Sequence, residues 1–206
     1  MARPKVALVD REDVIAKALG IIDREGLDAL SLRRIGTELG VSGAALYHHF
    51  ADKDEILRGV VERVLSREVI AHLGGSTWED FVVESAVRYR AALVAHPNTA
   101  PLMVHLGSGA RFGNTHREFV VRRMLEAGVP RRLCYPIMDS TETLAFGSAM
   151  MNPRQLPIHE RLGLDGGGEQ PNLQKVVRAS AKAADRVFRL ELSALVEGWR
   201  ALIAAA

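Results

Sequence analysis

The chain has 206 residues, of which 48% are hydrophobic and 25% charged, with a formal net charge of +2. This composition is that of a folded protein with one or two hydrophobic cores, and it excludes a disordered or fibrous chain. A single cysteine, Cys134, excludes an internal disulfide framework. No apolar run reaches the roughly 18 residues of a membrane span, and the start lacks a secretory apolar stretch, so we expect a cytoplasmic protein.

The charge balance does not by itself indicate a polyanion partner. Basic and acidic residues also nearly balance within residues 1–63. A nucleic-acid interface therefore has to be argued from the positions of particular charges rather than from their sum.

Helix signals follow one another from the N-terminus. Asp10 is a predicted N-cap for a helix ended by Gly26, and Ser31 is a predicted N-cap for a second helix ended by Gly40. The turn after Gly40 leads to Ser42, which caps a third, short helix. The inward positions are predicted from their spacing of three and four residues: Val14, Ile15, Ala18, Leu19, Ile22, Leu32, Ile35, Leu39, Leu46 and Phe50.

Further helices are predicted to the C-terminus. Asp52 and Glu55 resemble a capping box that begins a helix over 53–72, and Pro97 ends a helix that begins at Trp78. Helices are also predicted over about 114–127, 130–151 and 173–204, with a Gly- and Pro-rich loop over 153–172. The predicted fold is all-α, with an N-terminal domain over 1–52, a connecting helix within 53–75 and a C-terminal domain over 76–206.

The stretch VSGAALYHHF (41–50) places small residues in the first turn of the third helix. Two short helices joined by a tight turn form a helix-turn-helix, whose second helix contacts base edges through its N-terminal residues. Small side chains permit close approach to DNA, and hydroxyl, imidazole and basic groups donate to phosphates or bases. The candidate DNA contacts are Arg33, Ser42, Gly43, Ala44, Ala45, Tyr47, His48, His49 and Lys53. The alternative is a connecting helix whose small residues are merely tolerated at a surface.

The order LSLRRIGTELGVSGAALYHHFADKDEIL (30–57) resembles the DNA-binding domain of the TetR family of transcriptional regulators. The resemblance covers about a quarter of the chain. It implies DNA contacts from the third helix, Arg33 and Lys53, a dimer of all-α subunits, and a small-molecule effector that weakens operator binding. It does not say whether the protein represses or activates.

The C-terminal half resembles the tetracycline-repressor branch in TWEDFVVESAVRYRAALVAHP, VHLGS and FRLELSALVEGW. His105 falls where that branch has a magnesium-binding histidine, but no acidic partner follows at a matching place, so we expect a different effector. An apolar wall with few polar groups suits a small ligand. The candidate ligand-binding residues are Ser85, Tyr89, Met103 and His105. We expect no catalytic residue, no cofactor and no metal site of the protein alone, and the sequence leaves open whether His105 binds a metal together with a ligand.

The last predicted helix carries an apolar stripe that includes Phe188, Leu192, Leu195 and Trp199. A two-fold four-helix bundle with the segment LCYPIMDSTETLAFGSAM (133–150) would use this stripe as a dimer interface. The same residues could instead form a core within one chain.

Two other functions compete with regulation. An enzyme is disfavoured because GSGARFG (107–113) has neither a preceding strand nor dinucleotide-loop spacing, and no H-E-x-x-H occurs. Cys134 reads as a small core residue, with redox sensing as its alternative. A protein-interaction module that keeps the helix-turn-helix without binding DNA stays open because of the balanced charge. Arg3 and Lys5 are either an arm that contacts DNA or a solvated tail.

Overall fold

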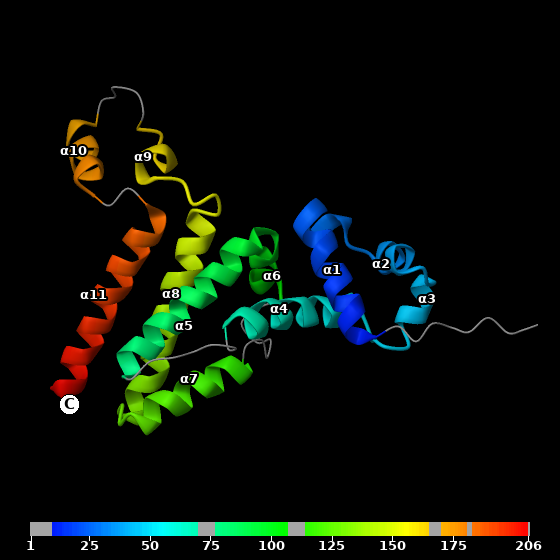
Figure 1. Ribbon diagram of the computed structural model, residues 1–206, viewed down its shortest axis with the longest axis horizontal. Coiled ribbons are helices and arrows are strands. Elements are labelled where there is room, and N and C mark those ends of the chain that lie inside the picture. The colour runs from blue at the N-terminus through cyan, green and yellow to red at the C-terminus, as the bar shows by residue number, and fades with distance from the viewer. Residues whose placement is uncertain (1–9, 70–76, 107–113, 165–169, 181–182, 206) are drawn as a thin grey trace, which may run out of the picture. The chain divides into compact units, whose positions relative to one another are not determined.

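The computed structural model describes residues 10–69, 77–106, 114–164, 170–180 and 183–205 (Figure 1). Within these ranges every regular element is helical, which confirms the all-α prediction. The chain divides into two compact units, the first comprising 1–66 with 96–113 and the second comprising 67–95 with 114–206. None of the helices in the described part is both long and apolar enough to span a membrane. Arg3, Lys5 and the GSGARFG segment lie outside the described residues.

Helix α1 (Arg11–Glu25) begins and ends as its sequence predicts. The Glu12 N–H donates to the Asp10 side chain over 3.2 Å, and Gly26 ends the helix with a φ of 82°. Its buried residues are Val14, Ala18, Ile21 and Ile22, whereas Ile15 and Leu19 are only half-buried. The inward face is therefore rotated slightly from the predicted one. A short 3-10 helix, η1 (Leu27–Ala29), leads to the next element.

Helices α2 (Leu32–Leu39) and α3 (Gly43–Leu46) form the predicted helix-turn-helix. Ser31 and Ser42 cap them by accepting the N–H groups of Arg34 and Ala45. Gly40 takes the left-handed conformation (φ 69°) that ends α2. A Cβ at the buried Gly36 would lie 2.8 Å from the Val41 carbonyl oxygen, so only glycine lets α2 approach the turn this closely. Ile35 is buried as predicted, whereas Leu32 and Leu39 are half-buried.

Helix α4 (Lys53–Val69) completes the support of this unit. Asp52 accepts the Glu55 N–H at 2.7 Å, and the Glu55 carboxylate accepts the N–H of Ala51 rather than that of Asp52. The predicted capping box is therefore present with a one-residue shift in its second bond. Close packing of α4 on α1 is visible at Gly59, where a Cβ would lie 2.6 Å from Ile15 Cδ1. The first unit also contains η2 (Pro97–Thr99) and α6 (Ala100–His105).

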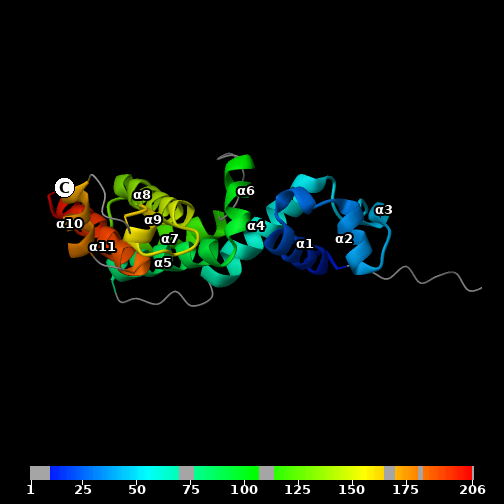
Figure 2. The same ribbon diagram turned by 90° about the horizontal axis from the view of Figure 1, so that it is seen from above.

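The second unit consists of α5 (Trp78–Ala95), α7 (Asn114–Glu126), α8 (Arg131–Met151), α9 (Ile158–Arg161), α10 (Pro171–Ala179) and α11 (Ala184–Ala204). Helix α8 contacts α5, α7 and α11, and α5 also contacts α7 and α11 (Figures 1 and 2). The core between them is largely apolar and includes Phe81, Leu93, Ile137, Phe188 and Leu192. Cys134 is also buried there, in accord with the core interpretation.

The C-terminal segment corrects two predictions. The predicted helix over 173–204 is divided into α10 and α11, and the predicted loop over 153–172 contains α9 and the first residues of α10. Ser180 ends α10 in an extended conformation (ψ 161°), and its hydroxyl donates to the Val176 carbonyl at 2.8 Å. A serine hydroxyl that bonds back to the preceding turn competes with helix continuation, and side-chain periodicity does not report this competition.

Arg90 holds the helices of the second unit together from within. Its guanidinium donates to Ser148 on α8 at 2.9 Å, contacts Asp185 on α11 at 3.5 Å and bonds to Gln155. It also lies 4.8 Å from the ring centre of Phe188. Burial lowers the pKa of Arg90 and the Asp185 carboxylate opposes that shift, so the charge is retained by its partners.

The close approach at Gly36 predicts a stability difference between two glycine variants. Gly36→Ala should lower the free energy of unfolding by about 1–3 kcal/mol, because its methyl group meets backbone atoms that cannot move independently. Gly20→Ala in α1 is the matched control, since its methyl would meet only the flexible end of Arg24 at 3.3 Å. Urea titration of both variants measures the difference, and equal stability would contradict the packing argument.

Candidate functional site

The exposed side of α3 and the turn after it forms one candidate site. Leu46 and Phe50 are buried as predicted and fix this short helix to the unit. Ser42, Ala44, Tyr47 and His48 are exposed, and 60% of the Tyr47 surface is accessible to solvent. Gly43, Ala45 and His49 are half-buried. The outer side of α3 therefore presents small residues beside one exposed aromatic ring and one imidazole, a surface that a partner can approach closely.

Arg33, in the first turn of α2, lies next to α3 and belongs to the same site. A Cβ at Gly43 would lie 3.3 Å from Arg33 Cα and 3.4 Å from the Leu32 carbonyl oxygen, so the first turn of α3 rests on the first turn of α2. Arg33 is exposed and has no ion-pair partner among the described residues. Lys53, at the start of α4, is also exposed and unpaired within the described part of the chain.

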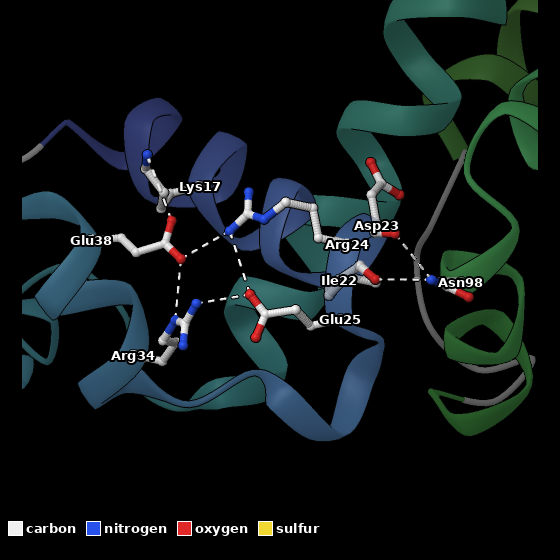
Figure 3. Close-up of polar contacts among 8 residues, drawn as sticks. All are labelled: Lys17, Ile22, Asp23, Arg24, Glu25, Arg34, Glu38 and Asn98. Carbon is white, nitrogen blue, oxygen red and sulfur yellow. Dashed lines mark hydrogen bonds and ion pairs between the residues drawn. The ribbon is translucent and has the colours of Figure 1, made fainter.

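The adjacent Arg34 is in a different situation (Figure 3). It pairs with Glu38 at 3.1 Å and with Glu25 at 2.8 Å, and Arg24 pairs with the same Glu38 at 2.9 Å. Burial raises the pKa of Glu38, but the hydrogen bond from Arg34 and the charge of Arg24 outweigh burial and lower it overall. These contacts join α1 to α2, so Arg34 has a structural role and Arg33 is left for a partner.

A second cluster of contacts fixes the turn that follows α3. Arg11 donates to the His49 carbonyl and pairs with Glu55 at 2.5 Å, and its guanidinium lies 4.2 Å from the Phe50 ring centre. The N–H of Ala51 and then Arg11 lower the pKa of Glu55. The starts of α1 and α4 are thereby tied to the turn that follows α3.

The far end of α1 is tied to the segment around η2. His96 Nδ1 lies 2.8 Å from Asp23 Oδ2. Asn98 donates to the carbonyls of Ile22 and Asp23 at 3.1 and 3.2 Å, as Figure 3 shows. Residues that follow α5 in the chain therefore cap the C-terminal carbonyls of α1. Sequence reasoning did not predict this contact, since the partners are more than 70 positions apart.

Comparison with known proteins decides the family. Residues 14–60, which span α1 to the first half of α4, match the family described as "Bacterial regulatory proteins, tetR family". The chain belongs to the TetR family of transcriptional regulators. It is a helix-turn-helix regulator of a non-enzymatic family.

The similarity to TetR proteins extends through the second unit. The chain is 26% identical to a class E tetracycline repressor of Escherichia coli over 95% of its own length and 93% of the relative. It resembles the solved structure of ActR from Streptomyces coelicolor in complex with (S)-DNPA, with 28% identity, coverage of 94% and 98%, and a TM-score of 0.69. It also resembles BioQ of Mycobacterium smegmatis, with 27% identity, the same coverage and a TM-score of 0.70.

The four predicted ligand-binding residues fall in different units. Ser85 and Tyr89 are buried on α5 in the second unit. Met103 is half-buried on α6 in the first unit, and the side chain of the neighbouring His105 lies outside the described residues. Among the described residues, no group of three His, Cys, Asp or Glu side chains could hold a metal ion.

The structure adds His116 to the candidate polar groups. It lies on the first turn of α7, is 5% exposed, and its Nε2 is 3.0 Å from Ser85 Oγ. Nearby in the same unit, Arg117 pairs with Glu142 on α8 at 2.8 Å. The sequence offered only a weak signal for His116, a histidine at a helix start with Val120 and Met124 on the same face.

The predicted dimer residues divide into two groups. Phe188 and Leu192 are 1% and 0% exposed within the single chain, where they form part of the core of the second unit. Leu195 and Trp199 are half-buried, and the Trp199 indole donates to Ser140 on α8 at 3.0 Å. Leu195 and Trp199 therefore retain surface that a partner could cover.

The difference between the two arginines predicts a binding result. Arg33→Ala should weaken specific DNA binding by about 1–3 kcal/mol through one base position, with little change in thermal stability. Arg34→Ala should instead lower the thermal stability, because it removes contacts between α1 and α2. Fluorescence anisotropy with DNA and thermal unfolding of both variants check this. Lower thermal stability in Arg33→Ala together with unchanged stability in Arg34→Ala would contradict these roles of the two arginines.

Burial of His116 predicts a pH dependence. Burial and then the charge of Arg117 lower the pKa of His116 from 6.5 to about 4, so the unfolded chain binds this proton more readily than the folded chain. The associated stability is complete above about pH 6.5 and is lost as the pH falls to about 4, by roughly 3 kcal/mol. His116→Phe should flatten the unfolding free energy over this range in urea titrations. An unchanged pH slope would contradict the assignment.

Proposed function

We propose that the protein is a homodimeric repressor that binds a palindromic operator and is released by a small-molecule effector. The observation that carries this proposal is the exposed α3 surface, with Tyr47 and His48 in solvent and Arg33 and Lys53 unpaired in the described structure. Members of the TetR family bind DNA and small molecules, which supports the same conclusion.

The proposed DNA contacts follow from the placement of each side chain. Ala44 and the half-buried Gly43 and Ala45 let the backbone come close to base edges. Tyr47, His48 and His49 donate to phosphate oxygens of the DNA backbone. Lys53 also contacts a phosphate. Arg33 reads a guanine from the first turn of α2, and Ser42 fixes the start of α3 by accepting the Ala45 N–H.

A groove between α8 and α11 supports the dimer. It has a volume of about 380 Å³, and α9 also contributes to its lining, which combines apolar residues such as Leu144, Met151 and Val187 with the charged Arg161 and Glu191. Met151 is 74% exposed in the single chain, and Leu202 near the end of α11 is 57% exposed. A second copy related by a two-fold axis would cover this surface and orient two recognition helices on one face of DNA.

Release by an effector requires coupling between the units. The chain crosses between them at 66–67, within α4, and again at 95–96 and 113–114. An effector that binds more tightly to a conformation unable to bind the operator shifts the population away from the DNA-binding state. The proposed ligand-binding residues are Ser85 and Tyr89 in the second unit and Met103 and His105 in the first.

Binding to DNA from beside the protein's own gene tests the regulatory function. We expect specific binding whose affinity falls steeply as salt increases from 50 to 200 mM, because phosphate contacts release counterions. Tyr47→Ala should weaken binding on all sequences, and Tyr47→Phe, which removes only the hydroxyl donor, should reproduce the part of that loss due to the phosphate hydrogen bond. Binding that ignores DNA sequence and salt would overturn the proposal.

A second candidate function is supported by the ion pairs of the first unit. Arg11, Arg24, Arg34, Arg58 and Arg63 are all paired with carboxylates, so little positive charge is free. Such a surface also suits a protein-interaction module. The same DNA titration separates the two functions, because an interaction module shows no specific operator complex.

The dimer predicts a difference between two leucines of α11. Leu195→Asp should give monomers, because Leu195 is half-buried and lies one helical turn beyond Glu191, a residue that lines the groove. Leu190→Asp is the control, since Leu190 lies on the opposite side of the helix and is 69% exposed. Light scattering measures both masses, and a dimer in Leu195→Asp with retained fold would argue against this interface.

A further inference from the structure

The side chain of His116 is buried with one nitrogen unused. Only 5% of the residue is exposed, Nε2 is bonded to Ser85, and Nδ1 is buried with no hydrogen-bond partner among the described residues. An unsatisfied buried polar atom costs about 1–3 kcal/mol, so proteins retain one where a ligand or water completes it.

The hydrogen-bond pattern assigns a role to each nitrogen. Burial and the neighbouring Arg117 lower the pKa of His116 to about 4, so the imidazole is neutral near pH 7. In the described structure the Ser85 hydroxyl has no acceptor other than His116 Nε2. The arrangement with fewest unsatisfied groups therefore has Ser85 donating to Nε2, which leaves Nδ1 protonated and available as a donor.

The surroundings select the rest of the ligand. Helices α5, α7 and α8 pack on one another and bury Phe81, one turn before Ser85, Val120, one turn after His116, and Ile137 on α8, so the core of these helices is largely apolar. Two arginines contact these helices: Arg117 forms a two-point ion pair with Glu142 at 2.8–3.2 Å, and Arg123, 5.6 Å from the Phe81 ring centre, pairs with Glu126 at 3.3 Å. Tyr89, one turn beyond Ser85 on α5, is buried, and its pKa is raised by burial and then by Glu142. No unneutralised positive charge is therefore offered to an anionic ligand by these groups.

We propose that His116, held by Ser85, binds the carbonyl oxygen of an uncharged, largely apolar effector through its Nδ1–H. This inference rests on the proposed effector-released function and specifies its ligand chemistry. Ser85 acts as a positioning residue that fixes the tautomer, and His116 makes the contact. A carboxylate ligand is disfavoured because a single neutral donor in a desolvated site does not compensate the loss of hydration of a full charge.

A matched pair of probes tests the contact. 9-Fluorenone carries a carbonyl oxygen, and fluorene has the same ring frame with a methylene in its place. The wild-type protein should bind fluorenone at least tenfold more tightly than fluorene in equilibrium dialysis. In His116→Phe this preference should disappear or reverse, because the remaining discrimination is hydrophobic. Lack of binding of both probes to the wild type, or an unchanged preference in the variant, would overturn the proposal.

A second measurement does not depend on the probes or on the folding of a His116 variant. Long-range ¹H–¹⁵N NMR of the ligand-free protein should show the Nδ1–H tautomer for His116. In Ser85→Ala the preference for this tautomer should be lost, whereas Glu118→Gln on the exposed side of α7 should leave it unchanged. An Nε2–H tautomer in the wild-type protein would overturn the assignment.

Operator binding, measured in parallel, separates this inference from the proposed function. If the wild-type protein binds its operator specifically but does not prefer fluorenone to fluorene, the proposed ligand chemistry is refuted and the repressor function is not. Selective fluorenone binding without any specific operator complex would refute the repressor and keep the ligand site.

Discussion

The close contact between α2, the turn and α3 is the constraint on which the rest of the structure depends. Gly36 has no room for a side chain against the Val41 carbonyl, and Gly43 rests on the backbone of Arg33. This contact makes the short α3 rigid, although a four-residue helix would not form alone in water. It also sets the distance between Arg33 and the exposed Ala44, Tyr47 and His48. The proposed DNA surface is thus a property of backbone packing before it is a property of charge.

Ion pairs determine which charges remain for a partner. Glu38 and Glu25 hold Arg24 and Arg34 between α1 and α2, and Glu55 holds Arg11 beside Phe50. Each exposed pair contributes little to stability alone, but a network that shares carboxylates fixes the geometry of three helices. Although the net charge is close to zero, the basic residues therefore fall into two groups: those that join helices through ion pairs, and Arg33 and Lys53, which are unpaired in the described region.

The sequence was informative where local chemistry determines local structure. Asp10, Ser31 and Ser42 cap helices as predicted, and Gly26 and Gly40 end them, because capping depends on neighbours within a few residues. The break at Ser180 was missed because periodicity continues across it. Long-range contacts were not predictable: the His96–Asp23 pair, the Arg90 network and the His116–Ser85 bond join residues far apart in the chain. For the same reason Phe188 and Leu192 could not be assigned to core or interface from their spacing alone.

The most direct test of the central claim locates α3 on the DNA. A single cysteine is placed at position 48 (His48→Cys) in a Cys134→Ser background. An iron–EDTA group, which cleaves DNA strands close to it, is attached to this cysteine in the folded protein. With operator DNA, the account predicts strand cleavage at two major-groove positions about 10 base pairs, or a multiple of that spacing, apart. Cleavage spread evenly along the DNA, or confined to a single position, would contradict a symmetric pair of recognition helices.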